Sequence, residues 1–206
     1  MEPIPVVAAL LVLAGIAIAL RATNGRLTVV GLGAALLGLP LAVGGIADPL
    51  VLAFRTVAIL LAMLLLDHAV RRTSALVGPI RLGGTSEAVL VIAAWSLGLL
   101  LGLTAPDPRG PAPALATGVA LGVAGATLLA FGHDTLRLGA GAMLGLAAAA
   151  VAVTAFGGSE NAALELGLAG ALLAIAGATA WLALVVASAR HDLELADRPR
   201  DLRDAG

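Results

Sequence analysis

Seven long apolar segments, separated by short polar stretches, fill this chain almost from end to end. Each is roughly 17 to 28 residues long, and a helix needs about 20 apolar residues to cross the hydrocarbon core of a bilayer. Backbone polar groups in lipid must be hydrogen-bonded within the segment, which a helix achieves. The predicted spans are 3–20, 27–46, 49–70, 87–103, 113–131, 136–156 and 162–189. The pattern predicts an all-α, polytopic transmembrane helix bundle with about seven spans.

Composition leaves no room for a water-soluble domain, because 60% of the 206 residues are hydrophobic and only 12% are charged. The longest loops, 71–86 and 104–112, are too short for a catalytic domain. We expect the lipid bilayer to be the solvent of this protein, and we expect no nucleic-acid partner.

Basic residues give the orientation. The chain has no lysine, and its 12 basic residues are all arginines. Ten lie at alternate predicted loops and in the tail: Arg21, Arg26, Arg71, Arg72, Arg81, Arg137, Arg190, Arg198, Arg200 and Arg203. The opposite loops contain Arg109. Because loops rich in arginine stay in the cytoplasm, the N-terminus is predicted outside and the C-terminus inside, in a multi-pass protein of the cell inner (plasma) membrane.

Charges inside the spans are the candidate functional residues, since an unpaired charge in lipid costs at least about 2.5 kcal/mol. Arg55 lies about 9 Å below the outer start of the third span, at 1.5 Å per residue. Asp48 precedes Arg55 by two helical turns and is a candidate counter-charge. The two residues form either a structural anchoring pair or a contact beside a proton or ion path of a partner.

Three further charged residues lie near span ends. Glu165, near the outer end of the seventh span, is either a proton-relay carboxylate or an interfacial residue. Asp67 and His68 precede a basic cytoplasmic turn, and Asp67 is spaced to pair with Arg71 at i, i+4 on a helix. Glu87 opens the fourth span, where a carboxylate favours a helix N-terminus.

Small residues predict where the helices pack. The chain has 26 glycines and 2% aromatic residues. Gly118 and Gly122 are four apart on the fifth span, and Gly141 and Gly145 are four apart on the sixth, a spacing typical of close helix packing in membranes. So few aromatic residues form a thin interfacial belt, which favours a bundle embedded among other subunits.

No catalytic, cofactor-binding or metal-binding residues are predicted. The chain has no cysteine, and its three histidines are scattered at predicted helix ends without metal-site spacing. No nucleophile with its base and no phosphate-binding loop is recognisable. An internal repeat, which many secondary transporters contain, is not recognisable either.

The layout and a few short matches resemble the hydrogenase-4 component E family, whose later part is similar to the K-type subunit of respiratory complex I and the C-type subunit of Mrp-type antiporters. The turn "HDTLRLGAGAML" fits the family frame at His133, Asp134, Leu136 and Gly141, and "LAFRTVAILLAMLLLDHAVRR" resembles its helix carrying a basic residue. The resemblance implies an N-terminal four-helix membrane part (1–112), a K-like three-helix part (113–189) and a cytoplasmic tail (190–206). Within the tail, we expect a solvated or partner-docked segment, with disorder favoured.

The K-like subunits are expected to carry carboxylates within two helices, but the corresponding positions here are apolar: Met143 or Leu146, and Gly177. Arg55 lies two positions ahead of the family's basic residue. The resemblance therefore implies a membrane scaffold subunit of a proton- or ion-translocating complex related to complex I, group 4 hydrogenases or Mrp antiporters. Its partners would be antiporter-like and other membrane subunits. The alternative is a stand-alone transporter of a small or hydrophobic solute.

Overall fold

The computed structural model describes residues 3–43, 49–73, 84–104, 112–155 and 162–196. The helices are α1 (Pro3–Arg21), α2 (Gly25–Val43), α3 (Pro49–Thr73), α4 (Gly84–Thr104), α5 (Ala112–Phe131), α6 (Thr135–Ala155) and α7 (Ala162–Ala196). Five are long and apolar enough to cross a membrane, and α1 and α4 contribute shorter apolar helices. The all-helical, polytopic fold predicted from the sequence is confirmed, and the chain is a multi-pass membrane protein.

Short polar turns connect the helix pairs and begin the next helix. Asn24 accepts a hydrogen bond from the backbone N–H of Arg26 at the start of α2, at 3.0 Å. Asp134 accepts one from the backbone N–H of Arg137 at the start of α6, at 2.8 Å. Such side-chain caps bind N–H groups that the first turn of a helix leaves free. With these caps, the α1–α2 and α5–α6 turns need only a few residues each.

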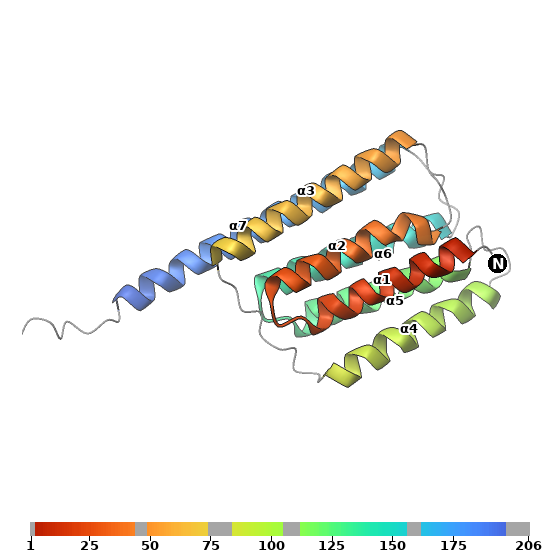
Figure 1. Ribbon diagram of the computed structural model, residues 1–206, viewed down its shortest axis with the longest axis horizontal. Coiled ribbons are helices and arrows are strands. Elements are labelled where there is room, and N and C mark those ends of the chain that lie inside the picture. The colour runs from red at the N-terminus through yellow and green to blue at the C-terminus, as the bar shows by residue number, and fades with distance from the viewer. Residues whose placement is uncertain (1–2, 44–48, 74–83, 105–111, 156–161, 197–206) are drawn as a thin grey trace, which may run out of the picture.

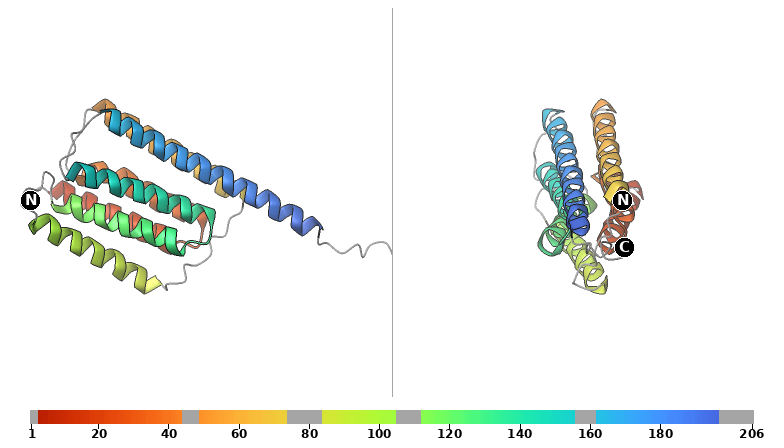
Figure 2. Two further views of the ribbon diagram at one scale, coloured as in Figure 1. Left: turned by 180° about the vertical axis from the view of Figure 1, so that it is seen from behind. Right: turned by 90° about the vertical axis from the view of Figure 1, so that its left-hand side faces the viewer.

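The helices form two rows of three (Figures 1 and 2). In each row consecutive helices are antiparallel, and α1, α2 and α3 lie beside α5, α6 and α7 respectively. Helices at the same place in the two rows run in the same direction, and α4 lies at the edge against α5 and α1. The start of α1 and the end of α7 therefore lie at opposite ends of the bundle.

The two rows are structural repeats, offset by 110 positions. In the α1–α2 turn, Ala22 donates a backbone hydrogen bond to Ile18; the α5–α6 turn repeats it from Gly132 to Leu128. The bonds Thr28 to Asn24 and Leu138 to Asp134 are related in the same way. The chain thus consists of α1–α3, a connecting helix α4, and α5–α7. This repeat was not recognised in the sequence, because different apolar side chains can occupy equivalent positions of a membrane helix.

The α5/α6 pair packs on the α1/α2 pair, and each pair uses a different face for this contact. We call the side containing Leu39 in α2 and its equivalent Ala149 in α6 the front face, and the side containing Leu37 and its equivalent Ala147 the back face. The front face of α1/α2 is buried (Ala9, Ile16, Leu39 and Ala42, all 0% exposed), whereas the equivalent positions of α5/α6 are partly or fully exposed. The back faces show the reverse: Leu10, Val30, Leu37 and Leu41 are exposed, and Ala120, Ala140, Ala147 and Val151 are buried. The back of α5/α6 therefore packs on the front of α1/α2.

Glycines bring the paired helices into backbone contact. A Cβ on Gly15 would lie 2.6 Å from the backbone of Gly31 and Ala35 in α2. The equivalent Gly125 in α5 would meet Gly141 and Gly145 in α6 at 2.8 and 2.9 Å. No side chain fits at these crossings, so only glycine allows the two repeats to form their tight first hairpins.

Helix ends agree with the sequence prediction except at α7. The predicted ends Ile46 and Phe156 lie outside the described residues, as do residues 197–206 of the tail. Helix α7 continues past the predicted end at Ala189 to Ala196, so disorder is not correct for that part of the tail. Its 35 residues span about 52 Å, more than the roughly 30 Å of a hydrocarbon core. Helix contacts also cross the predicted boundary at residue 112, through α3–α7 and α4–α5, so the division into two parts stays a prediction.

Candidate functional site

An ion pair joins the two repeats within the predicted spans. Nη1 of Arg55, in the second turn of α3, donates a hydrogen bond to Oε2 of Glu165, in the first turn of α7, at 3.2 Å. The two side chains are 19% and 15% exposed. They occupy equivalent positions of the two repeats, 110 residues apart. Each side chain thus supplies the counter-charge that the other needs in lipid.

Apolar side chains surround this pair. The adjoining cavity has a volume of about 10 Å³ and lies among Leu36, Ile59, Leu146 and Leu172. A cavity needs about 10–15 Å³ to hold one water molecule. The interface between the repeats therefore has room for at most a single water at this point, and none for a solute.

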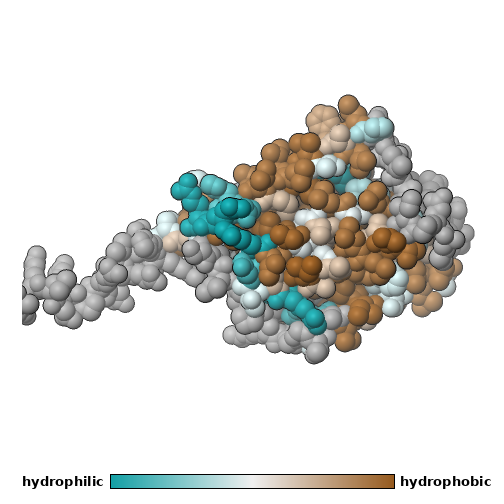
Figure 3. Space-filling view, viewed as in Figure 1, coloured by the Kyte–Doolittle hydropathy of each residue, from teal (hydrophilic) through white to brown (hydrophobic). Residues whose placement is uncertain are grey.

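The other predicted charged residues lie elsewhere. Asp48, the predicted partner of Arg55, lies outside the described residues. Asp67 accepts a hydrogen bond from Nε of Arg71 at 2.6 Å, as the i, i+4 spacing predicts, and the pair is largely exposed at the opposite end of α3. His68 is exposed beside it. Figure 3 shows hydrophilic residues gathered at that end of the α1–α3 row, with apolar residues across its middle.

A second charged cluster, at the end where α1 finishes and α6 begins, was missed as a candidate site. Arg137 is only 2% exposed; its Nη2 donates to the carbonyl oxygen of Ala22 at 3.1 Å. Its Nε lies 3.5 Å from Oδ2 of Asp134 and has no hydrogen-bond acceptor among the described residues. Arg137 thus ties the start of α6 to the α1–α2 turn across the two rows.

Glu87 belongs to the same cluster. It lies in the first turn of α4, as predicted, but it is only 4% exposed. Its carboxylate is within electrostatic range of Arg137 and Arg21. The sequence offered one signal for this cluster, a run of arginines and acids at the ends of several spans, but Arg137 was interpreted only as a marker of topology.

Apart from the two charged clusters the described interior is almost entirely apolar; Nε1 of Trp95, in α4, is buried without a hydrogen-bond partner among the described residues. The remaining buried polar residues are Thr28, Thr117, Thr127 and Thr179, whose hydroxyls donate to carbonyl oxygens of the preceding helical turn. Met143 is fully buried, and Leu146 and Gly177 are partly buried. The described residues therefore provide no continuous polar path from Arg55 and Glu165 to Arg137.

The four glycines predicted to pack helices all lie on the α5 and α6 hairpin. A Cβ on Gly118 would lie 2.8 Å from Val151, and one on Gly122 would make ordinary contact with Ala148. A Cβ on Gly141 would meet Gly125 at 2.9 Å, whereas one on Gly145 would meet nothing within 4 Å. Gly145 therefore has space for a side chain, although its backbone lies close to Gly125 of α5.

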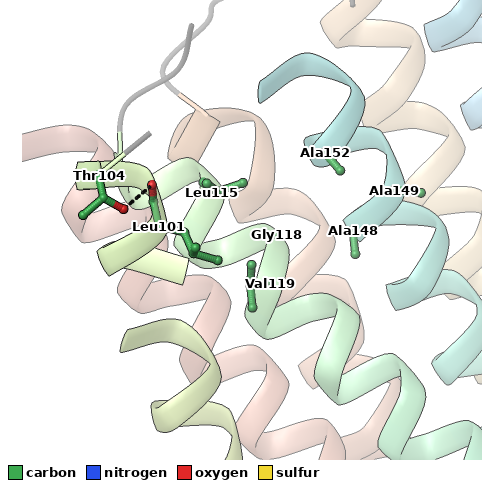
Figure 4. A pocket seen from close by; sticks show the side chains of 8 residues that line it. All are labelled: Leu101, Thr104, Leu115, Gly118, Val119, Ala148, Ala149 and Ala152. Atoms are coloured by element: carbon green, nitrogen blue, oxygen red, sulfur yellow. Dashed lines mark hydrogen bonds between the residues drawn. The ribbon is translucent and has the colours of Figure 1, made fainter. Parts of the chain in front are cut away.

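An apolar groove of about 460 Å³ opens on the front face of α5/α6, beside α4 (Figure 4). It is lined by Leu101, Thr104, Leu115, Gly118, Val119, Ala148, Ala149 and Ala152. The hydroxyl of Thr104 already donates to the carbonyl oxygens of Leu100 and Leu101. The groove thus presents hydrocarbon to an occupant.

Among the described residues, no group of histidine, aspartate and glutamate side chains is arranged to hold a metal ion. No protein-family model, curated protein or solved structure matches this chain.

Proposed function

We propose that this protein is an integral membrane scaffold subunit of a multisubunit ion- or proton-translocating redox complex. In the proposal, the complex is related to complex I, group 4 hydrogenases or Mrp antiporters and lies in the plasma membrane. The C-terminal end of α7 faces the cytoplasm. The subunit positions antiporter-like and other membrane subunits and does not itself conduct ions.

The observation that carries the proposal is the neutral, closed interface between the repeats. Arg55 and Glu165 bind each other at 3.2 Å, and the adjoining cavity is about 10 Å³. An ion path needs polar groups or water along its length. In the described interior, the buried polar residues other than the two charged clusters are threonines, whose hydroxyls donate to carbonyl oxygens four residues earlier. One further buried polar atom is Nε1 of the partly buried Trp95, which has no hydrogen-bond partner among the described residues.

The architecture also supports the resemblance noted from the sequence. A three-helix unit with a short turn between its first two helices, as the K-like subunits have, occurs twice in this chain, as α1–α3 and α5–α7. The unusually thin aromatic belt, at 2% of residues, fits a subunit surrounded by protein on several sides.

The alternative function, a stand-alone transporter, gains one observation from the fold. Transporters are often built from repeats, and parallel repeats are among the known arrangements. Their substrate sites lie at the repeat interface near the middle of the membrane, beside discontinuous helices. Here that interface is packed with aliphatic side chains, so the scaffold function is favoured.

Purification of the tagged chain from its own membranes tests the proposal. We expect it to migrate with large antiporter-like proteins in a complex of defined composition, identified by native gel and mass spectrometry. A monodisperse homo-oligomer would contradict the proposal, as would solute or proton transport by the purified chain alone in vesicles.

A further inference from the structure

The front face of α5/α6 is equivalent to a protein–protein contact that already exists inside the chain. The front face of α1/α2, which includes Ala9 and Leu39, is fully buried against the next row of helices. The equivalent residues Val119 and Ala149 are accessible. One repeat therefore has its front face covered by a helix pair, and the other has the same face free.

The free face is also hollowed by a groove. At the position of Leu39 in α2, α6 has Ala149, and at the position of Ile16 in α1, α5 has Ala126. Of these, Ala149 lines the groove of about 460 Å³, together with Gly118. A fitted helix surface whose side chains fill this groove gains dispersion contacts with its lining.

We propose that the front face of α5/α6, with its groove, docks a pair of antiparallel transmembrane helices from a partner subunit. This inference rests on the proposed function. The occupant is apolar and uncharged at the contact, and it presents large aliphatic side chains to fill the space above Ala149. Leu101 and Thr104 of α4 form one wall that fixes the position of the pair along the groove.

A second copy of this chain is the less suitable occupant. It would place its exposed back face, with Leu37 and Val30, on the free front face. Such a head-to-tail contact leaves a new free front face at every step, and it generates an open-ended array unless the rotation closes. A different subunit would cover the free front face without presenting another one, so association would stop after one contact.

The test uses Ala149→Trp, which fills the groove, in the native membrane. The matched control is Ala174→Trp, on an exposed position of α7. We expect Ala149→Trp to lower the complex-bound fraction of the chain about tenfold, which corresponds to 1.4 kcal/mol, and Ala174→Trp to leave it unchanged. If Ala149→Trp does not fold, Ala149→Phe, which is also larger than the leucine of the covered α2 position, replaces it with the same expectation.

A cross-link identifies the occupant. Because the chain has no cysteine, Ala149→Cys can carry a single benzophenone probe. Adducts on two neighbouring apolar spans of one other subunit support the proposal. Adducts on lipid alone or on a second copy overturn it, and so does an intact complex with Ala149→Trp; these results leave the scaffold function standing. If wild type and control themselves occur only as free chains, the proposed function fails instead.

Discussion

Arg55 and Glu165 form an ion pair between α3 and α7 from equivalent positions of the two repeats, 110 residues apart in the chain. The pair is a polar contact between the third helices of the two rows. Both side chains are mostly buried within the predicted spans, at 19% and 15% exposed, where an unpaired charge is costly. This relationship makes the pair the first place to test the roles of the two residues.

Replacing one member of the pair should be costly. We expect Arg55→Leu to destabilise the fold by about 3–5 kcal/mol, because it leaves the Glu165 carboxylate buried without a counter-charge. The assembled complex should lose this subunit or its coupled transport. The measurement is the unfolding midpoint in detergent, together with the complex-bound fraction in membranes. The control is Asp67→Asn in the exposed pair with Arg71, where the cost should be about 0–1 kcal/mol.

The double variant Arg55→Leu/Glu165→Leu separates a structural role from a role in proton transfer. Replacing both partners of a buried pair by apolar residues is often neutral or stabilising. We expect the double variant to regain wild-type stability, assembly and coupled transport. Normal assembly with transport abolished would instead show that Glu165 relays protons, and the scaffold interpretation would then be wrong.

The sequence predicted the positions of the helices well, but it did not predict which helices contact each other. The length and apolarity of each segment fix a membrane helix locally, so α1, α3 and α5 begin and end within three residues of the predicted bounds. Which helices touch depends on side-chain fit between segments far apart in the chain. The sequence therefore flagged Arg55 and Glu165 as separate residues and assigned Asp48 to Arg55.

The repeat was hidden for a related reason. Alanine, leucine, valine and glycine are all compatible with a lipid environment, so helix packing alone determines which of them occupies a given position. Equivalent positions can therefore differ as Leu39 and Ala149 do, one buried and one exposed, without loss of the helix. Hydrogen-bonded turns and the two glycine crossings keep the relationship visible in three dimensions.

Arg137 should be more important to stability than any exposed arginine at the same end. Arg137→Met removes the contact with the Ala22 carbonyl and leaves Glu87 and Asp134 without this cation. We expect a loss of about 3–5 kcal/mol, whereas Arg26→Met, at an exposed position, should change stability by less than about 0.5 kcal/mol. Chemical denaturation of the purified variants measures both, and equal effects would contradict the role assigned to Arg137.

Two glycines four residues apart on α6 should respond differently to the same substitution. A Cβ on Gly141 would lie 2.9 Å from the carbonyl oxygen of Gly125, so Gly141→Ala must push α5 and α6 apart. We expect a cost of about 1–3 kcal/mol. Gly145→Ala meets nothing within 4 Å and should be neutral or slightly stabilising, because alanine favours a helix by about 1 kcal/mol over glycine. Thermal unfolding of both variants measures the difference. Equal losses of stability would mean that α5 and α6 do not cross at Gly141 as described.

Orientation in the membrane can be measured directly, because every introduced cysteine is unique in this chain. Thr23 and His133 are exposed in the turns at one end of the bundle, and Pro49 is exposed at the other. If the arginine-rich end lies in the cytoplasm, a membrane-impermeant maleimide added to spheroplasts should label Pro49→Cys at once. Thr23→Cys and His133→Cys should react only after permeabilisation. The two turns occupy equivalent positions of the two repeats, so they must behave alike; labelling of one without the other would contradict the parallel arrangement of α1–α3 and α5–α7.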